Sequence, residues 1–208
     1  MTSNIDRERV VAAVRELLTA IGEDPDRAEL ASTPDRVANA YEEFFAGVGV
    51  DPLDEITELA VADADTGELV LMRGIDFRSV CEHHLLPFRG RAHIAYRPHA
   101  KILGLGTIAR LVDIIASRPQ LQERLGEQIA ETMNEALAPE GVLVVLEARH
   151  GCVSDRGANQ ASARITTVAS RGVLSEPAAR AEAISLIGAA TSGADPRAGE
   201  ARSDGSPQ

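Results

Sequence analysis

The amino-acid sequence predicts an α+β domain, with a pair of helices on one face of an antiparallel sheet. Three observations carry this prediction. The chain of 208 residues suits one ordinary domain, its 44% hydrophobic content is enough for a sizeable core, and its central segments follow the order strand, strand, helix, helix, strand, strand. The second face of such a sheet needs a cover, which in a small domain is usually a neighbouring subunit. We therefore expect a homo-oligomer.

The first 68 residues are expected to form a helical extension. Apolar residues recur at helical spacing over residues 7–21, which is typical of an amphipathic helix. A second helix is expected to begin at Ser32, as a hydroxyl cap with Pro34 in the first turn, and to end near Phe45. Residues 1–68 are accordingly assigned to this extension.

The catalytic domain is assigned to residues 69–190. Short segments rich in apolar residues predict strands at 69–77, 91–96, 142–148 and 161–169. Helical spacing predicts helices at 106–118 and 121–137, separated by the break at Pro119, and one more at 176–187. Residues 191–208 carry no large apolar side chain and are expected to be a disordered tail, because they cannot bury enough surface to offset their ordering entropy.

The charge of the chain argues against a nucleic-acid partner. Its formal net charge is -11, whereas binding to a polyphosphate backbone needs a broad basic surface. A small anionic substrate stays compatible with this charge, since a few arginines in one cleft can reverse the local potential. The chain has no run of about eighteen apolar residues and no signal-peptide core at its N-terminus, so we expect no membrane association and a cytoplasmic location.

Two cysteines, Cys81 and Cys152, stand out because a cytoplasmic chain rarely forms disulfides. Cys81 and His84 are two residues apart, a spacing that lets both side chains meet one ion. Two thiolates and one imidazole favour zinc, and three protein ligands leave one tetrahedral position open, as in catalytic sites. The alternative is that the cysteines are buried small hydrophobes. The concentration of reactive side chains in two short segments favours the metal site.

Two further histidines neighbour these ligands. His83 is expected to point away from the metal on a turn, whereas His150 and Cys152, two apart on a predicted strand, should share a face. An imidazole with a near-neutral pKa suits proton transfer in either direction. For His83 the alternative is a supporting contact to a metal ligand.

Three separated motifs together resemble the GTP cyclohydrolase I family. They are residues 81–84 (CEHH), residues 118–125 (RPQLQERL) and residues 150–152 (HGC) followed by an Arg-Gly pair, in family order, and the likeness extends over residues 7–174. The resemblance implies a tunnelling fold (T-fold), a homodecamer of two pentameric rings and active sites at subunit interfaces. It also implies that zinc activates the water that attacks the guanine ring of GTP, so that formate leaves and 7,8-dihydroneopterin triphosphate forms.

The resemblance also assigns roles to individual residues. It implies that Zn2+ is held by Cys81, His84 and Cys152, and that His83 and His150 move protons. The positions that match the family's substrate-binding residues are Gln122 and Glu123 for the guanine edge and Arg110 and Arg156 for the triphosphate.

The sequence departs from the family pattern at Gly106 and Thr107, where the family has serine and lysine. Two alternatives therefore stay open: a paralogue that uses another purine nucleotide or stops at a ring-opened intermediate, and a non-catalytic T-fold assembly. The presence of His83, His150, Gln122 and Glu123 argues against the non-catalytic assembly, because a structural zinc site needs none of them. For Glu123 alone, the solvated first turn of a helix is the competing interpretation.

Overall fold

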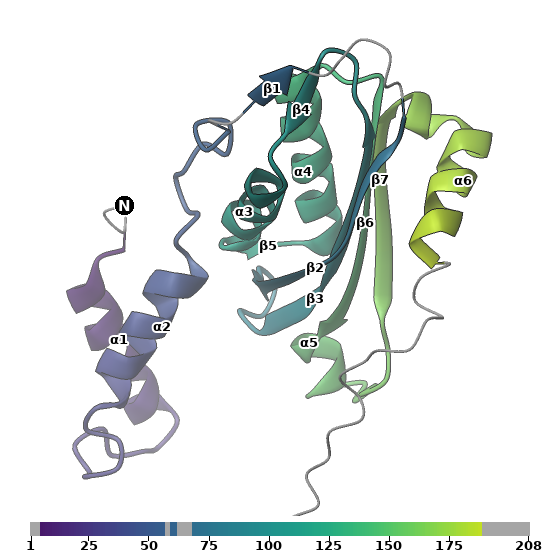
Figure 1. The fold of residues 1–208 in the computed structure, drawn as a ribbon. Coiled ribbons are helices and arrows are strands. Elements are labelled where there is room, and N and C mark those ends of the chain that lie inside the picture. Colours follow the sequence, from purple (N-terminus) through teal and green to yellow (C-terminus); the bar gives the residue numbers. More distant parts are fainter. Residues whose placement is uncertain (1–4, 57–58, 62–67, 189–208) are drawn as a thin grey trace, which may run out of the picture.

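A computed structural model describes residues 5–56, 59–61 and 68–188; the tail expected at 191–208 lies outside the described residues. The helical segments are α1 (Arg7–Ala20), α2 (Thr33–Phe44), α3 (Leu105–Ala116), α4 (Gln122–Leu137), α5 (Gly151–Ser154), the 3-10 turn η1 (Val173–Ser175) and α6 (Pro177–Gly188). The strands are β1 (Leu59–Val61), β2 (Val70–Cys81), β3 (Pro87–Arg97), β4 (Lys101–Leu103), β5 (Pro119–Gln120), β6 (Gly141–His150) and β7 (Ile165–Gly172). Figure 1 labels them.

The main sheet has five strands in the order β5-β2-β3-β6-β7. All neighbours in it are antiparallel except β2 and β5, and β1 pairs separately with β4. The predicted α+β class and the order strand, strand, helix, helix, strand, strand are confirmed, and this order is in keeping with the T-fold that the resemblance implied.

Several predicted boundaries were wrong. The strands expected at 69–77 and 91–96 are longer, because β2 continues through Cys81 and β3 begins at Pro87, which pairs with Val80. The predicted break between the two helices at Pro119 is confirmed, and it takes the form of the short strand β5, which lies parallel to the end of β2. Strand β7 begins only at Ile165, so the start expected at residue 161 falls in a turn.

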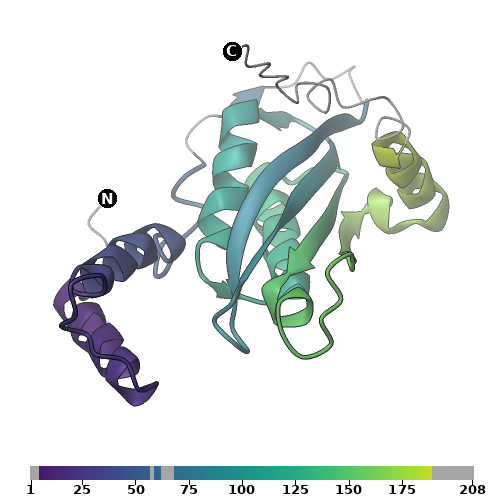
Figure 2. The same cartoon turned by 90° about the horizontal axis from the view of Figure 1, so that it is seen from below.

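One face of the sheet packs against α3 and α4 (Figures 1 and 2). Alternate side chains of β3 and β6 point to these helices, and Ile94, Val144 and Leu146 are fully buried with Ile115 and Ile129 of the helices. This is the main hydrophobic core. This core sets where α4 lies along β6, and it therefore places the first turn of α4 at the lower end of the sheet.

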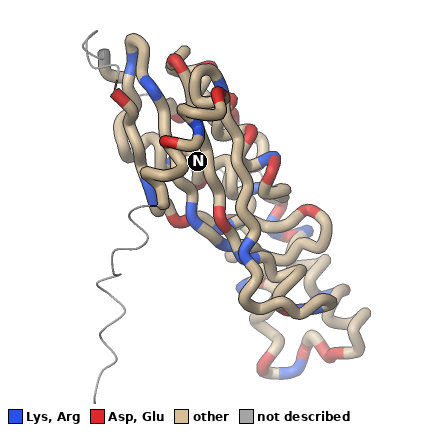
Figure 3. Tube along the Cα trace, turned by 90° about the vertical axis from the view of Figure 1, so that its right-hand side faces the viewer, with Lys and Arg blue, Asp and Glu red and all other residues tan. Residues whose placement is uncertain are grey.

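The opposite face is covered partly by the chain itself. Helix α6 and η1 pack there, with Ala183 and Ile187 buried against Ala95 and Leu143. The expectation that a neighbouring subunit must cover this face therefore applies only to the part beyond α6. Figure 3 looks onto this side of the molecule, where both basic and acidic positions are visible.

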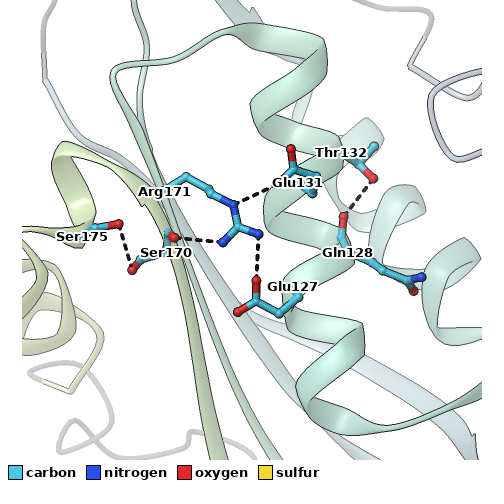
Figure 4. A network of polar contacts seen from close by, with 7 residues as sticks. All are labelled: Glu127, Gln128, Glu131, Thr132, Ser170, Arg171 and Ser175. Atoms are coloured by element: carbon cyan, nitrogen blue, oxygen red, sulfur yellow. Dashed lines mark hydrogen bonds and ion pairs between the residues drawn. The ribbon is translucent and has the colours of Figure 1, made fainter.

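Arg171 on β7 ties the edge of the sheet to α4 (Figure 4). Its guanidinium donates to Glu127 at 2.7 Å and to Glu131 at 2.9 Å, two carboxylates one turn apart on the helix. These ion pairs are partly exposed, so each contributes modestly. Together with the apolar core they hold α4 against β7, the strand that supplies partners to the active-site side chains.

Helices α1 and α2 pair with each other to one side of the sheet (Figure 1), and α2 contacts the sheet through Glu43, which lies 3.4 Å from Arg78 of β2. Arg7 donates to Asp35 at 2.8 Å across the pair. The expected cap at Ser32 is wrong in one respect: Ser32 has helical backbone angles and its hydroxyl makes no capping hydrogen bond, although Pro34 does lie in the first turn. Among the described residues, no helix is long and apolar enough to cross a membrane.

Candidate metal centre and active site

Cys81, His84 and Cys152 come together at one end of the sheet. One ligand atom from each side chain lies within 4.8 Å of the other two. Cys81 is the last residue of β2, and a tight turn brings His84 back beside it, with the N–H groups of His84 and Leu85 donating to the Cys81 carbonyl at 3.3 and 2.8 Å. The backbone itself therefore sets the position of two of the three candidate ligands.

Cys152 reaches the cluster through a short helical turn. The expectation that His150 and Cys152 share one face of a strand is wrong, because β6 ends at His150 and Cys152 lies in α5. The Asp155 N–H donates to the Gly151 carbonyl, and the Ser154 hydroxyl donates to the His150 carbonyl, both at 3.0 Å. A continuing strand would move about 3.3 Å per residue past the end of the sheet, whereas this turn folds Cys152 back toward Cys81.

The chemistry of the three donors fits a divalent soft cation. Burial, followed by the neighbouring Cys81 thiol, raises the pKa of Cys152, while Arg156 acts weakly in the opposite direction. Two thiolates so close together repel each other, and a bound cation would stabilise both of them in the deprotonated form. Thiolate and imidazole ligands suit zinc, and three of them leave one tetrahedral position for a small molecule.

His150 is held beside this cluster by two contacts. Its ring stacks on Phe88 at 4.5 Å between centroids with a 5° angle between planes. Its Nε2 lies 2.7 Å from Oε1 of Gln122. The Gln122 amide nitrogen donates to the carbonyls of Leu146 and Ile165 at 3.1 and 2.9 Å, which fixes the orientation of the amide. His150 must then carry its proton on Nε2, leaving Nδ1 as an acceptor.

The surroundings of His150 favour its neutral form. Burial lowers the pKa of His150, and the nearby Glu123 carboxylate offsets this effect only in part. A neutral imidazole with a fixed tautomer is suited to accept a proton on Nδ1 and to return it later. This part of the site can therefore act as a general base without rearrangement.

Gln122 has a position that sequence reasoning missed. It was expected at the edge of a bound guanine, yet it is 1% exposed and its amide binds the backbone of β6 and β7 as well as His150. The partners lie 24 to 43 residues away in sequence. No local spacing pattern could have indicated them.

The remaining candidate residues lie around the cluster on the surface. His83 is exposed and lies outside the group of three close ligand atoms; its ring stands at 89° to that of His84. Glu123 is exposed next to Gln122, and Arg156 is exposed near Cys152. Arg110 is exposed on α3, and no acidic partner for it occurs in the described parts of the chain.

An ion pair that the sequence did not predict links the metal turn to α4. Arg124 donates to both carboxylate oxygens of Glu82, at 2.6 and 3.1 Å. This interaction lowers the pKa of Glu82, the residue between Cys81 and His83. Because the two residues are 42 apart in sequence, only their presence in two of the resembling motifs could have brought them to notice.

A mixed sheet that ends in a two-thiol, one-imidazole cluster, with an oriented histidine whose pKa is lowered by burial two residues before one of the thiols, fits a metal-dependent hydrolase of the α+β class. The family model described as GTP cyclohydrolase I matches residues 10–188. The chain belongs to the GTP cyclohydrolase I family, and it is an enzyme of that type.

Relatives named GTP cyclohydrolase 1 match nearly their whole length. The protein of Leifsonia xyli subsp. xyli is 55% identical over 186 residues, which are 89% of this chain and 97% of the relative. That of Streptomyces griseus subsp. griseus is 53% identical over 88% of this chain and 90% of its own. That of Clostridioides difficile is 49% identical over 89% and 98%. A solved structure, the apo form of archaeosine synthase QueF-Like, aligns with 53% of this chain and 96% of its own at 20% identity and a TM-score of 0.43.

Proposed function

We propose that this protein hydrolyses the imidazole ring of the guanine in GTP, releases formate and forms 7,8-dihydroneopterin triphosphate. The observation that carries the proposal is the convergence of Cys81, His84 and Cys152 within 4.8 Å of one another, with His150 at the end of β6, two residues before Cys152. The family membership of the chain and the names of its relatives support GTP as the substrate.

The cluster is proposed to hold Zn2+. Its two sulfur donors and one nitrogen donor disfavour magnesium and calcium, which prefer oxygen ligands. When bound, zinc lowers the pKa of a coordinated water toward about 7 and so supplies a nucleophile at neutral pH. The chain contributes the fixed ligand geometry and the groups that bind the substrate next to it.

His150 is proposed to receive a proton on Nδ1 when the ring is attacked and to return it as the ring opens. Its tautomer, held by Gln122, and its lowered pKa support this role. His83 is proposed to transfer a second proton from the exposed side of the metal turn, where its ring is free to reach a bound substrate.

Three side chains are proposed to bind the nucleotide, and a fourth to support the guanine site. Glu123 would accept hydrogen bonds from the guanine ring N–H and amine, a pairing that leaves no buried donor unsatisfied. Arg110 and Arg156 would hold the triphosphate through their guanidinium forks. Gln122 would support the guanine site from behind, since its amide is already bound to His150 and to two strands.

We further propose a cytoplasmic homo-oligomer, with a decamer as the form that the family resemblance implies. Large apolar side chains are exposed at α1, where Leu17 is 59% exposed and the C-cap residue Ile21 is 66% exposed, and Val168 is 43% exposed on the edge strand β7. Exposed apolar patches and unpaired edge strands of this kind are typical of subunit interfaces. Sedimentation should give a mass well above two chains, and a mass near the 22.1 kDa monomer would contradict the assembly.

The direct test is to incubate the zinc-loaded protein with GTP and to follow formate and pterin fluorescence separately. We expect both products, and neither with Cys152→Ala, which removes a metal ligand. Absence of both products from the metal-loaded parent protein would refute the proposed reaction.

Release of formate without pterin would indicate the alternative of a truncated reaction, which the departure at Gly106 and Thr107 motivates. A Cβ added at Gly106 meets no heavy atom within 4 Å, so Gly106→Ser fits the fold. Thr107 is only 6% exposed, so a lysine there would have to turn outward. The parent protein should therefore be compared with two variants, the single variant Gly106→Ser and the double variant Gly106→Ser with Thr107→Lys. Pterin formation that appears only in these variants would assign the truncation to this departure.

A further inference from the structure

Three arginines form a row across three strands on the sheet face opposite the metal cluster. The register pairs Arg78 of β2 with Arg89 of β3, and Arg89 with Arg149 of β6. Residues directly opposite on neighbouring strands share a face and lie about 5 Å apart, and like charges in such pairs are destabilising. Folding alone does not explain this arrangement, which we call the arginine row.

In the next row of the same sheet, opposite charges face each other across the strands, which is the usual arrangement. There the register pairs Arg91 with Asp76 on one side and with Glu147 on the other, so that charges alternate. The Arg91 guanidinium lies 3.5 Å from the Asp76 carboxylate. The sheet thus carries one row with compensated charges and, one step away on the same face, a row without compensation between its members.

The outer members of the arginine row have carboxylate partners at its ends. Arg78 lies 3.4 Å from Glu43 of α2, and Arg149 lies 2.7 Å from Asp155. Arg89, between two guanidinium groups, pairs with no carboxylate in the described parts of the chain. Arg89 is therefore the position at which an external anion would relieve the most repulsion.

The surface around Arg89 is hollowed. A hollow of about 670 Å³ is lined by four arginines and two carboxylates, and one of these arginines, Arg164, directly precedes β7. Arg89 also lines the two adjoining hollows, of about 280 and 400 Å³. A volume in this range accommodates a small metabolite. The excess of positive charge here contrasts with the net charge of -11 of the whole chain.

This surface is separate from the metal cluster. Adjacent residues of a strand point to opposite faces, so Arg89 and Arg149 face away from Phe88 and His150, which stack on each other on the helix-covered side. The arginine row therefore lies on the face of the sheet opposite to the metal cluster and to Arg110 of α3, whereas Arg156 directly follows Asp155, the partner of Arg149.

We propose that the arginine row binds a small metabolite that carries an oligophosphate group. Guanidinium groups bind phosphate oxygens through two parallel hydrogen bonds. Across three strands the row spans roughly 10 Å, twice the spacing of neighbouring strands, which suits a chain of phosphates better than a single phosphate or carboxylate.

The test titrates inorganic triphosphate into the full-length, zinc-loaded protein by calorimetry. The background is the double variant Arg110→Ala, Arg156→Ala, which removes the proposed substrate-phosphate contacts. We expect saturable binding there, with affinity reduced at least about tenfold by Arg89→Ala and less than about twofold by Arg73→Ala. Arg73 is the matched control because it is an exposed arginine on β2 outside the hollow. Zinc content is measured after each titration, since triphosphate chelates divalent cations.

Thermal unfolding distinguishes ligand binding from a structural role. In buffer without phosphate, Arg89→Ala should unfold at the same or a higher temperature than its background, because it removes like-charge repulsion. With triphosphate the order should reverse, and Arg89→Lys should fall between the two. The proposal is overturned by absence of saturable binding, by equal affinity with and without Arg89, or by a lower unfolding temperature of Arg89→Ala in phosphate-free buffer.

Discussion

The two faces of the sheet differ at the same end of the molecule. On the helix-covered face, His150 is stacked on Phe88 and bonded to Gln122, and Gln122 is bonded in turn to two strands. On the opposite face, Arg89 has guanidinium groups as its cross-strand neighbours. The first face has its polar groups positioned by folding alone, as catalysis requires. On the second face, Arg89 has no carboxylate partner among the described residues, although Arg78 and Arg149 beside it each have one.

Removal of a metal ligand should have the largest effect. It should abolish metal binding on the helix-covered face and leave the opposite face unchanged. Cys81→Ala, His84→Ala and Cys152→Ala are each expected to reduce zinc from about one ion per chain to near zero, because two ligands do not hold the ion as three do. Elemental analysis measures this. Full metal content in any one variant would remove that residue from the site, and triphosphate binding to the arginine row should be unchanged in all three.

A substitution at Gly90 should destabilise the sheet itself and should therefore affect both of its faces. Gly90 lies between Arg89 and Arg91, and a Cβ there would collide with the Glu147 carbonyl oxygen and with Ala148 on β6. We expect Gly90→Ala to lower the unfolding free energy by about 3 kcal/mol, since backbone must move. Gly106→Ala is the control, because its Cβ meets no neighbour within 4 Å. Equal denaturation midpoints for the two variants would show that the strands do not approach as closely as described.

Substitution of His150 should have a smaller effect, on the rate of reaction alone. His150→Ala is expected to keep zinc and to lose at least about a hundredfold in formate release, the usual scale of general acid–base catalysis. Gln122→Ala should also lower kcat, because the His150 ring would lose the contact that orients it. Gln128→Ala, further along the same helix, should not, because the Gln128 side chain accepts from Gln120 and not from His150. Loss of zinc from His150→Ala would assign His150 to metal support.

The smallest effect concerns the pH dependence of stability on the open face. Burial lowers the pKa of His93 below its ordinary value of 6.5, and Arg73 and Arg91 add to this while Glu147 opposes it. The folded chain then holds fewer protons than the unfolded chain just below pH 6.5, so this stability is present above that pH and is lost as the pH falls through the folded pKa. His93→Gln should lessen the drop in unfolding temperature between about pH 7.5 and about pH 5.5, and exposed His99→Gln should not. Identical pH profiles of parent and His93→Gln would contradict this.

The sequence predicted what depends on local pattern. Apolar periodicity located the helices that became α3 and α4, and the two-residue gap between Cys81 and His84 indicated two of the ligands. Pattern could not show that β2 runs on through Cys81, because strand length there is set by pairing with β3. Nor could it show α5, which positions Cys152 through hydrogen bonds of its own backbone.

Contacts between distant segments were beyond sequence reasoning for the same reason. The bond from Gln122 to His150 spans 28 residues, and the pair of Arg78 and Arg89 depends on the register of β2 and β3. A shift of that register by one residue would move Arg89 to the other face. Alternation along one strand predicts which residues share a face, but not which residues stand opposite them.

We propose that two thiolates and one imidazole of this chain hold a catalytic zinc ion. X-ray absorption at the zinc edge of the protein loaded with one equivalent tests it most directly. We predict two sulfur scatterers at about 2.3 Å and one imidazole nitrogen at about 2.0 to 2.1 Å, with one further light atom in the open position. A spectrum with only oxygen and nitrogen neighbours, or with a single sulfur, would contradict the assignment of Cys81, His84 and Cys152.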